Sequence, residues 1–433
     1  MEAGQKTAMD EWKANWPLVL TCMLAVTWLT APSSSLGLFM EPLQKEFGWG
    51  RAQISYGPAI YAMISIVLVP FYGAAVDKFG TRTIGLPGLA LNGLAFAAFG
   101  LLTGSIAHWL GAWVLYTLTQ LMIGTFLWNG AISATFAKSR GLAIGVVMGG
   151  TAIGQIVTPL ASRWLIDAYG WRMAYVFLGI GWAGLALVIC LLFFHDPRAR
   201  RKGETSAAQQ NRQGTPQGGL TFGEALRTPR FLRLACAILL QSTLATGLIL
   251  HLVPMLSHSG ISRAEAASIA AATGVMAMLG QLVTGWLADR TTTTLLPVSC
   301  FLWTGLGYLL LRQGEGSELV LWLGALSAGY ALGATINITT YLTSRYVGVL
   351  HFGKIYGVIS SAMRLGAGLG PVIAGTIFDK SGSYDGYLLL GMGASCAAAL
   401  LVFALGSYPS FTAIQPEDSP EEINAEAMGK PAT

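Results

Sequence analysis

The chain has 433 residues, of which 53% are hydrophobic and only 11% are charged. Soluble domains contain about 25% charged residues, so this composition excludes a soluble globular protein. The formal net charge of +5 comes with basic residues that lie between apolar stretches, and it does not indicate a nucleic-acid partner.

Long stretches without Lys, Arg, Asp or Glu divide the chain. The stretch between Thr83 and Ala137 is long enough for two membrane crossings, because a transmembrane helix needs about 20 apolar residues. The five cysteines fall within such stretches and show no metal-binding spacing, so we expect no metal site. The pattern predicts transmembrane helices near residues 16–40, 53–76, 83–103, 109–136, 141–166, 173–195, 231–257, 264–288, 293–311, 319–344, 354–378 and 386–407.

Basic residues between these spans indicate the orientation, because connections on the inner side of a membrane are enriched in Lys and Arg. With the amino terminus inside, the short inner connections contain Lys78, Arg82, Lys138, Arg140, Arg290, Arg345 and Lys354. The central inner connection adds a further cluster of arginines. We therefore expect a multi-pass protein of the plasma (inner cell) membrane, with both termini in the cytoplasm.

A polar stretch in the middle separates two sets of six predicted spans. It is rich in Gln, Asn and Gly and is typical of a flexible linker. The predicted organisation is an amino-terminal six-helix bundle (1–195), a cytoplasmic linker (196–230), a carboxy-terminal six-helix bundle (231–408) and a cytoplasmic tail (409–433).

The two halves match each other at a constant offset of 212 positions. The residues that are identical at this offset include Asp, Arg and Pro in addition to Gly. Chance matches between scattered glycines therefore do not explain the repeat. A parallel repeat of six spans, with a binding site at the midplane between the halves, is a known plan of transporters. The matched pairs include Pro42/Pro254, Arg51/Arg263, Asp77/Asp289, Gly154/Gly366, Pro159/Pro371, Asp167/Asp379 and Tyr175/Tyr387.

The connection after the second span reads Gly73-Ala-Ala-Val-Asp77-Lys78-Phe-Gly-Thr-Arg82, and its partner in the second half reads Gly285-Trp-Leu-Ala-Asp289-Arg290. This pattern resembles the Gly-x-x-x-Asp-Arg/Lys-x-Gly-x-Arg signature of the major facilitator superfamily, and the resemblance extends over the whole chain. It implies an all-α membrane protein with twelve transmembrane helices in two pseudo-symmetric six-helix bundles. It also implies that Gly73, Asp77, Lys78, Arg82, Gly285, Asp289 and Arg290 form an inner gating motif that favours the outward-open state.

Two further segments bear on the branch of the family. Gly366 to Pro371 resembles the glycine–proline motif of drug:proton antiporters, although that motif is known in the fifth span and the fuller copy here is in the eleventh. The antiporter pattern Arg-x-x-x-Gly is replaced by Gln120-Leu-Met-Ile-Gly124, which lacks the charge. The segment from Gly37 to Ser55 is similar to the first outer connection of the monocarboxylate porters and of the related oxalate:formate antiporters.

Arg364 lies about ten residues into the eleventh predicted span. An Arg near the bilayer centre costs about 2.5–3.5 kcal/mol on insertion scales, and its guanidinium stays charged. No Asp or Glu falls in the interior of any predicted span to neutralise it, since the acidic residues lie at span ends, so the simplest partner is the carboxylate of a substrate. Backbone carbonyls and water are the alternative partners. The oxalate:formate antiporters, which the chain resembles, use a second basic residue in the eighth span. Here that span offers Gln281 and Thr284, so one carboxylate is favoured over two.

Further candidates for lining a cavity follow from helical spacing, and each is equally compatible with hydrogen bonding between helices. The first span contains the weakened stretch Pro32-Ser-Ser34-Ser, and the fourth has an aromatic and polar face that includes Tyr116, Gln120 and Trp128. The substrate-binding candidates are Arg364, Asn337, Tyr330, Tyr341, Tyr61, Ser34, Trp128 and Ser360.

His251 is the one histidine well inside a predicted span, and it lies towards the outer third of the seventh span. Histidine titrates near neutral pH, so His251 is a candidate for carrying a coupled proton. The alternative is a histidine that only hydrogen-bonds to a neighbour.

These observations predict a secondary active transporter of small organic anions of the monocarboxylate type, which works by alternating access. Proton symport, exchange and facilitated diffusion stay open. The alternatives are efflux of drug-like or neutral metabolites, dicarboxylate/monocarboxylate exchange, and a non-transporting sensor on the same fold. An enzyme is disfavoured, because no metalloprotease motif or nucleophile–base pair is present. We expect a monomer in the lipid bilayer with a small carboxylate substrate, no cofactor, no catalytic residue and no nucleic acid.

Overall fold

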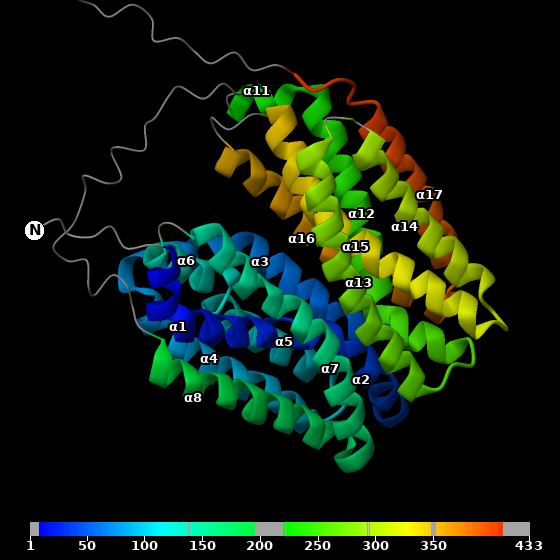
Figure 1. Ribbon diagram of the computed structural model, residues 1–433. Coiled ribbons are helices and arrows are strands. Elements are labelled where there is room, and N and C mark those ends of the chain that lie inside the picture. Colours follow the sequence, from blue (N-terminus) through cyan, green and yellow to red (C-terminus); the bar gives the residue numbers. More distant parts are fainter. Residues whose placement is uncertain are drawn as a thin grey trace, which may run out of the picture.

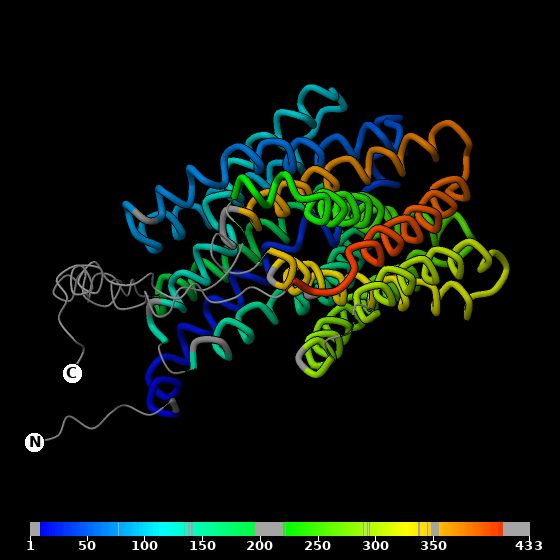
Figure 2. The backbone as a smooth tube through the Cα atoms, turned by 90° about the horizontal axis from the view of Figure 1, so that it is seen from above, coloured from blue at the N-terminus to red at the C-terminus, as the bar shows by residue number. Residues whose placement is uncertain are grey.

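The computed structural model describes residues 8–136, 139–194, 220, 222–291, 293, 295–347 and 352–409. Over these ranges the chain is helical and contains no β-strand. Figure 1 and Figure 2 show two groups of long helices side by side, one from each half of the chain.

The amino-terminal bundle holds the helices of the first half. A 3₁₀ turn, Ala98–Leu101, extends α4, and a π-helical turn, Phe177–Trp182, joins α7 to α8. The helices are α1 (Ala8–Leu29), α2 (Ala31–Phe47), α3 (Arg51–Phe79), α4 (Thr81–Ala97), α5 (Ile106–Met122), α6 (Thr125–Thr135), α7 (Arg140–Val176) and α8 (Ala183–Phe193).

The carboxy-terminal bundle holds the helices of the second half. The short α11 lies within the range predicted as linker, and the backbone N–H of Leu220 just before it donates to the carbonyl of Val347. That part of the linker range is therefore folded against the bundle. The helices are α11 (Phe222–Arg227), α12 (Pro229–His258), α13 (Arg263–Arg290), α14 (Leu295–Gln313), α15 (Glu318–Val347), α16 (Phe352–Ser381) and α17 (Asp385–Phe403).

Among the described residues, 11 segments are long and apolar enough to cross a membrane. One of them, Leu142–Phe193, is 52 residues long and contains two predicted spans. Gly170 separates these spans with a φ of 79°, a left-handed conformation that glycine adopts without strain. The prediction of a twelve-span helical membrane protein is confirmed, while the exact domain boundaries stay a prediction, since residues 195–219 and 410–433 lie outside the described ranges.

The first predicted span consists of two helices, because the chain breaks at Thr30 between α1 and α2. Pro32 sits in the first turn of α2, where its missing N–H leaves no hydrogen bond unmade. The helix then continues to Phe47, beyond the predicted end at residue 40. Lys45 and Glu41 form an ion pair of 2.7 Å one helical turn apart, which lets charged residues extend the helix.

The two most extensive lines of contact between the bundles are called the charged seam (α3 with α16) and the neutral seam (α7 with α13), and a smaller contact joins α2 to α12. Glycine permits the close approach in both. A Cβ on Gly368 of α16 would lie 2.7 Å from the Cβ of Ala62 on α3, and a Cβ on Gly274 of α13 would lie 3.2 Å from Cγ1 of Ile156 on α7.

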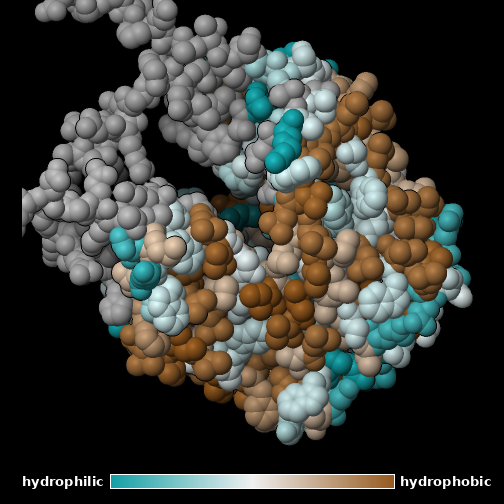
Figure 3. All heavy atoms as spheres, in the orientation of Figure 1, coloured by the Kyte–Doolittle hydropathy of each residue, from teal (hydrophilic) through white to brown (hydrophobic). Residues whose placement is uncertain are grey.

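One end of the molecule is closed by contacts between the bundles, and we call it the sealed end. There the carboxylate of Asp379 on α16 accepts hydrogen bonds of 2.9 Å from the backbone N–H groups of Arg51 and Ala52, which begin α3. Glu41 on α2 forms an ion pair with Arg263 on α13. Towards α6 and α11 the two bundles diverge (Figure 1). The face shown in Figure 3 is hollowed between them, and its surface over the helices is largely hydrophobic.

Candidate substrate-binding site

The first of two adjoining cavities between the bundles is rich in aromatic side chains, and we call it the aromatic pocket. Its volume is about 160 Å³. Most of its wall comes from α1, α2, α3 and α5, with Leu250 contributed by the other bundle. The lining residues are Leu29, Pro32, Ser33, Pro58, Tyr61, Trp113, Tyr116, Gln120 and Leu250.

The second cavity lies between the bundles along the neutral seam, and we call it the seam pocket. Its volume is about 240 Å³, and it shares Ser33 and Leu250 with the aromatic pocket, so the two cavities adjoin. The polar residues on its wall are Ser33, Ser34, Gln155, Thr246 and Thr273. The break before α2 therefore supplies serines to both cavities.

Most polar groups of the aromatic pocket are already hydrogen-bonded within the protein. The Tyr116 hydroxyl donates to Oε1 of Gln120 at 2.9 Å, and Nε2 of Gln120 donates to the Leu29 carbonyl at 3.3 Å. One exception is the indole N–H of Trp113, which is buried and has no partner among the described groups. Because these polar groups bond to each other or to the backbone, the pocket presents mainly apolar aromatic surface to a ligand.

Arg364 lies on the charged seam, beside the aromatic pocket. It sits one helical turn before Gly368, whose Cα faces Ala62 of α3, so both residues occupy the same side of α16. The guanidinium interacts electrostatically with Tyr61, which lines the aromatic pocket. Arg364 therefore faces the other bundle rather than the lipid.

The side chain of Arg364 is half-buried. Within the described part of the chain, no carboxylate pairs with its guanidinium and no hydrogen bond reaches it. A permanent cation that is partly withdrawn from water is stabilised by an anion or by ordered water. The site is therefore suited to a ligand with a negative charge.

The predicted site residues fall into two groups. Tyr61 and Ser34 line the cavities, and Ser360 is half-buried one turn from Arg364 on α16. Tyr330 packs its ring 5.7 Å from the ring of Trp303 on α14, and Tyr341 donates to the Thr291 carbonyl at 3.3 Å. The structure thus does not bring these two tyrosines to Arg364.

Trp128 also lies away from the cavities. It is fully buried inside the amino-terminal bundle, and its indole N–H donates to the Ile123 carbonyl at 2.8 Å. Asn337 belongs to α15, but its side chain lies outside the described residues. On α15 the residues that line the seam pocket are Leu332 and Ile336, so the apolar side of this helix faces the cavity.

Some cavity residues were missed by the sequence analysis. Trp113 of α5 is one turn before Tyr116 on the same face of the helix, and that spacing is the signal that was available. Gln155 on α7 and Thr273 on α13 both line the seam pocket, but an isolated polar residue in a span does not reveal which way it points.

His251 lies at the sealed end rather than in either cavity. It is fully buried, and its imidazole contacts groups from both bundles. Nδ1 is 2.8 Å from the hydroxyl of Tyr384, and Nε2 is 3.1 Å from the hydroxyl of Ser55 on α3. His251 is therefore a part of the contact that closes this end.

The predicted gating motif lies at the opposite end of the helices. Arg82 donates to the carbonyls of Phe194 at 2.5 Å and of Leu191 at 3.2 Å, so it stabilises the carboxy-terminal end of α8. Lys78 and Arg290 are exposed and lie over the rings of Phe79 and Trp286. The side chains of Asp77 and Asp289 lie outside the described residues, and the latch role of the motif, including Gly73 and Gly285, stays a prediction.

Two helical bundles with cavities between them and a half-buried cation beside one of these cavities are typical of a membrane transport protein. The family model described as "Major Facilitator Superfamily" matches residues 22–371 and 234–428. The chain belongs to this superfamily.

The chain is also similar to vertebrate transporters of one branch. "Monocarboxylate transporter 12" of Rattus norvegicus is 25% identical, with 90% of this chain and 85% of the relative covered. "Monocarboxylate transporter 13" of Bos taurus is 25% identical, with 96% and 94% covered. "Monocarboxylate transporter 11" of Mus musculus is 26% identical, with 82% and 79% covered. The predicted resemblance to the monocarboxylate porters is thereby confirmed.

Solved structures support the same fold. A bacterial homologue of the human lysosomal transporter Spinster, solved in an inward-facing and unoccupied conformation, has a TM-score of 0.64. It is 18% identical, and the match covers 93% of this chain and 95% of the other.

Proposed function

We propose that this protein transports small monocarboxylates across the membrane by alternating access, and that Arg364 binds the carboxylate. The single observation that carries the proposal is the half-buried guanidinium beside a cavity, without an anionic partner among the described side chains. The similarity to the monocarboxylate transporters supports the substrate class.

The aromatic pocket supports a substrate with an apolar body. A cavity of about 150 Å³ in another protein accommodates benzene, and the volume here is about 160 Å³. The carboxylate pairs with Arg364, and Tyr61 both lines the pocket and interacts electrostatically with that cation. Arg364 is the cation beside the aromatic pocket in the described part of the chain, and a single positive charge favours a substrate with one carboxylate over a substrate with two.

We further propose that the protein acts as a monomer in the plasma membrane with both termini in the cytoplasm. The basic residues of the connections support this orientation. The sealed end is then the outer end, and the two bundles open towards the cytoplasm. Rocking of the bundles about the cavities would expose the site to each side in turn.

The test is flux of labelled monocarboxylates into proteoliposomes, with wild-type protein and Arg364→Gln. Glutamine keeps hydrogen-bond donors but removes the charge. Loss of a desolvated charge pair costs about 2 kcal/mol or more, so we expect uptake at low substrate concentration to fall at least about 30-fold.

The matched control is Arg312→Gln. Arg312 forms an ion pair of 2.6 Å with Asp385 at the protein surface, and such pairs contribute about 0–1 kcal/mol. Uptake should stay near the wild-type level. If Arg364→Gln transports monocarboxylates as well as wild type, the anion-binding role is wrong, and transport of neutral compounds or cations becomes the better hypothesis.

A further inference from the structure

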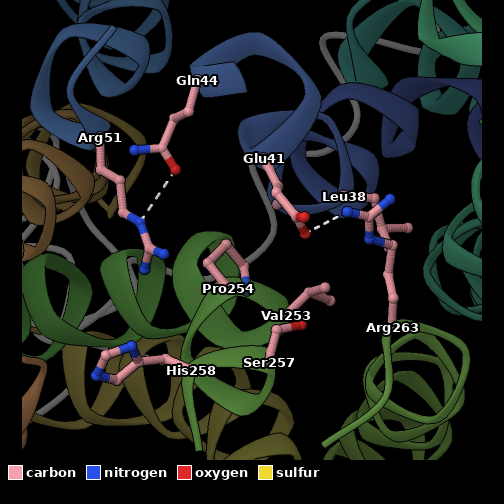
Figure 4. Close-up of a pocket in the computed structure, with 10 residues that line it drawn as sticks. Leu38, Glu41, Gln44, Arg51, Val253, Pro254, Ser257, His258 and Arg263 are labelled. Atoms are coloured by element: carbon pink, nitrogen blue, oxygen red, sulfur yellow. Dashed lines mark hydrogen bonds and ion pairs between the residues drawn. The ribbon is translucent and has the colours of Figure 1, made fainter. Parts of the chain in front are cut away.

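The contact at the sealed end contains a chain of hydrogen bonds that runs from one bundle to the other. Nη1 of Arg51 on α3 donates to the Tyr384 hydroxyl at 2.5 Å. That hydroxyl is 2.8 Å from Nδ1 of His251 on α12, whose Nε2 is 3.0 Å from the Pro371 carbonyl on α16. Figure 4 shows Arg51 pointing towards α12, with its Nε bonded to Gln44.

The partners determine where the protons lie. The Pro371 carbonyl only accepts, so Nε2 of His251 carries a hydrogen. Arg51 only donates, so the Tyr384 oxygen accepts from it and uses its own hydrogen to donate to Nδ1. Every group is satisfied when His251 is neutral, with Nδ1 as an acceptor.

A second proton on His251 conflicts with this arrangement. Nδ1 would then become a donor that faces another donor, and the Tyr384 hydrogen would lose its acceptor. The positive ring would also be repelled by Arg51, with which His251 already interacts electrostatically. Because the ring is fully buried, water does not relieve either effect.

The neighbouring ionisable groups do not compensate. Both carboxylate oxygens of Asp379 accept from the backbone of α3, and Glu41 is paired with Arg263. The described titratable groups at this end, on α12 and the elements around it, are Glu41, Lys45 and Glu46 on α2, Arg51 on α3, His258 on α12, Arg263 and Glu265 on α13, Glu318 on α15, Asp379 and Lys380 on α16, and Tyr384, Asp385 and Tyr387 at the start of α17. Glu265 and Glu318 interact with each other at the surface, and the Tyr387 hydroxyl donates to the Leu244 carbonyl at 2.6 Å.

We propose that His251 is a proton-binding site that locks the sealed end when neutral and releases it when protonated. The sealed state excludes the proton, whereas separation of the bundles would free Nδ1 and move Arg51 away. By linkage, a rise in proton activity favours the open state, and one proton changes the open-to-closed ratio by up to tenfold per pH unit. Acidic solution at the outer side would thus open this end to substrate.

The experiment measures the distance across the sealed end without any substrate. Spin labels are attached to cysteines that replace Ser105, before α5, and Gln313, at the end of α14, after the exposed Cys236 and Cys396 are changed to serine. Double electron–electron resonance on the reconstituted protein then gives the fraction with a long distance. We expect this fraction to rise as the pH falls from 8 to 5.5.

Three variants test the assignment. His251→Gln offers one donor and one acceptor but does not titrate, so it should stay closed over the whole pH range. Tyr384→Phe keeps the imidazole but removes the hydroxyl, and should weaken the response. His258→Gln is the matched control, because His258 is exposed on the same helix, and it should respond as wild type does.

A wild-type distance that does not change with pH overturns the proposal, and so does a His251→Gln protein that responds as wild type does. Arg364→Gln should keep the full pH response, because it lies outside the chain of hydrogen bonds. Failure of the proposed anion transport is thereby distinguished from failure of the proton lock.

Discussion

The charged seam and the neutral seam are related by the repeat, yet they differ in chemistry. The offset of 212 positions relates α3 to α13 and α16 to α7, and it pairs Ala62 with Gly274 and Ile156 with Gly368. At these equivalent positions each seam therefore packs a glycine of one helix against a side chain of the other helix. The glycine belongs to α16 in one seam and to α13 in the other.

The residues beside these contacts have diverged. In the charged seam Arg364 interacts with Tyr61, whereas the equivalent residues of the neutral seam are Ala152 and Thr273. The hydroxyl of Thr273 donates to the Ala270 carbonyl of its own helix at 2.6 Å. Both seams allow the bundles to pack, but at this level of the described helices the charged seam has a cation where the neutral seam has Ala152.

The sealed end shows the same divergence. Asp379 of α16 accepts two backbone hydrogen bonds from α3, but its equivalent Asp167 forms an ion pair with Arg163 one turn away on its own helix. At the start of α13 the hydroxyl of Ser262 accepts from the Glu265 N–H at 3.2 Å instead. The start of α3 is therefore held by a carboxylate of the other bundle, whereas α13 is joined to the other bundle through the side chain of Arg263, which pairs with Glu41.

The largest effect is expected from Gly368→Ala. The new Cβ would lie 2.7 Å from the Cβ of Ala62, and overpacking of this kind costs about 1–3 kcal/mol. The closed-to-open ratio at the sealed end should fall about 5- to 150-fold, as measured by the distance between spin labels at positions 105 and 313.

The double variant Ala62→Gly with Gly368→Ala moves the glycine to the other helix, which is the arrangement of the neutral seam. It removes the atom with which the new Cβ clashes, so closure should return towards wild type. If the double variant stays as open as Gly368→Ala, the two seams are not interchangeable at this contact.

A smaller effect is expected from Asp379→Asn. The amide has one acceptor oxygen and no charge, so it loses one of the two bonds to α3 and weakens the other. Loss of a helix cap typically costs about 1 kcal/mol, which corresponds to about a fivefold shift towards the open state in the same distance measurement.

Asp167→Asn is the symmetry-matched control. It removes an ion pair within one helix, and such pairs contribute about 0.3–0.5 kcal/mol. Equal shifts of the closed-to-open ratio in the two variants would show that the contact of Asp379 with α3 stabilises the closed state no more than the ion pair of Asp167 does.

The sequence predicts much of the fold because charges mark the ends of spans and the repeat marks the two bundles. The prediction ended the first span at residue 40 because Glu41 is charged, but Glu41 finds Lys45 and Arg263 as partners and the helix continues. Spacing of charges alone does not show that a charged residue is paired within a helix.

The site is less predictable, because it depends on how each helix is rotated. Arg364 is conspicuous in the sequence, as a cation inside a span. The spacing of Tyr330 and Tyr341 places both tyrosines on one face of α15, but it does not show whether that face points towards the cavity. In the structure Ile336 of this helix lines the cavity instead. The partners of His251 come from three other segments, so no local pattern contains them.

The smallest effect is expected from Tyr61→Phe. The variant keeps the ring in the aromatic pocket and removes the hydroxyl beside Arg364. If this hydroxyl donates to the carboxylate of the substrate, its loss costs about 0.5–1.5 kcal/mol and raises the KM for monocarboxylate uptake about twofold to tenfold. Thr273→Val is the equivalent change in the neutral seam and should leave the KM unchanged, because that hydroxyl bonds within its own helix. Equal effects of the two variants would contradict the assignment of the substrate anion to the charged seam, since a central anion in contact with both seams would sense both hydroxyls.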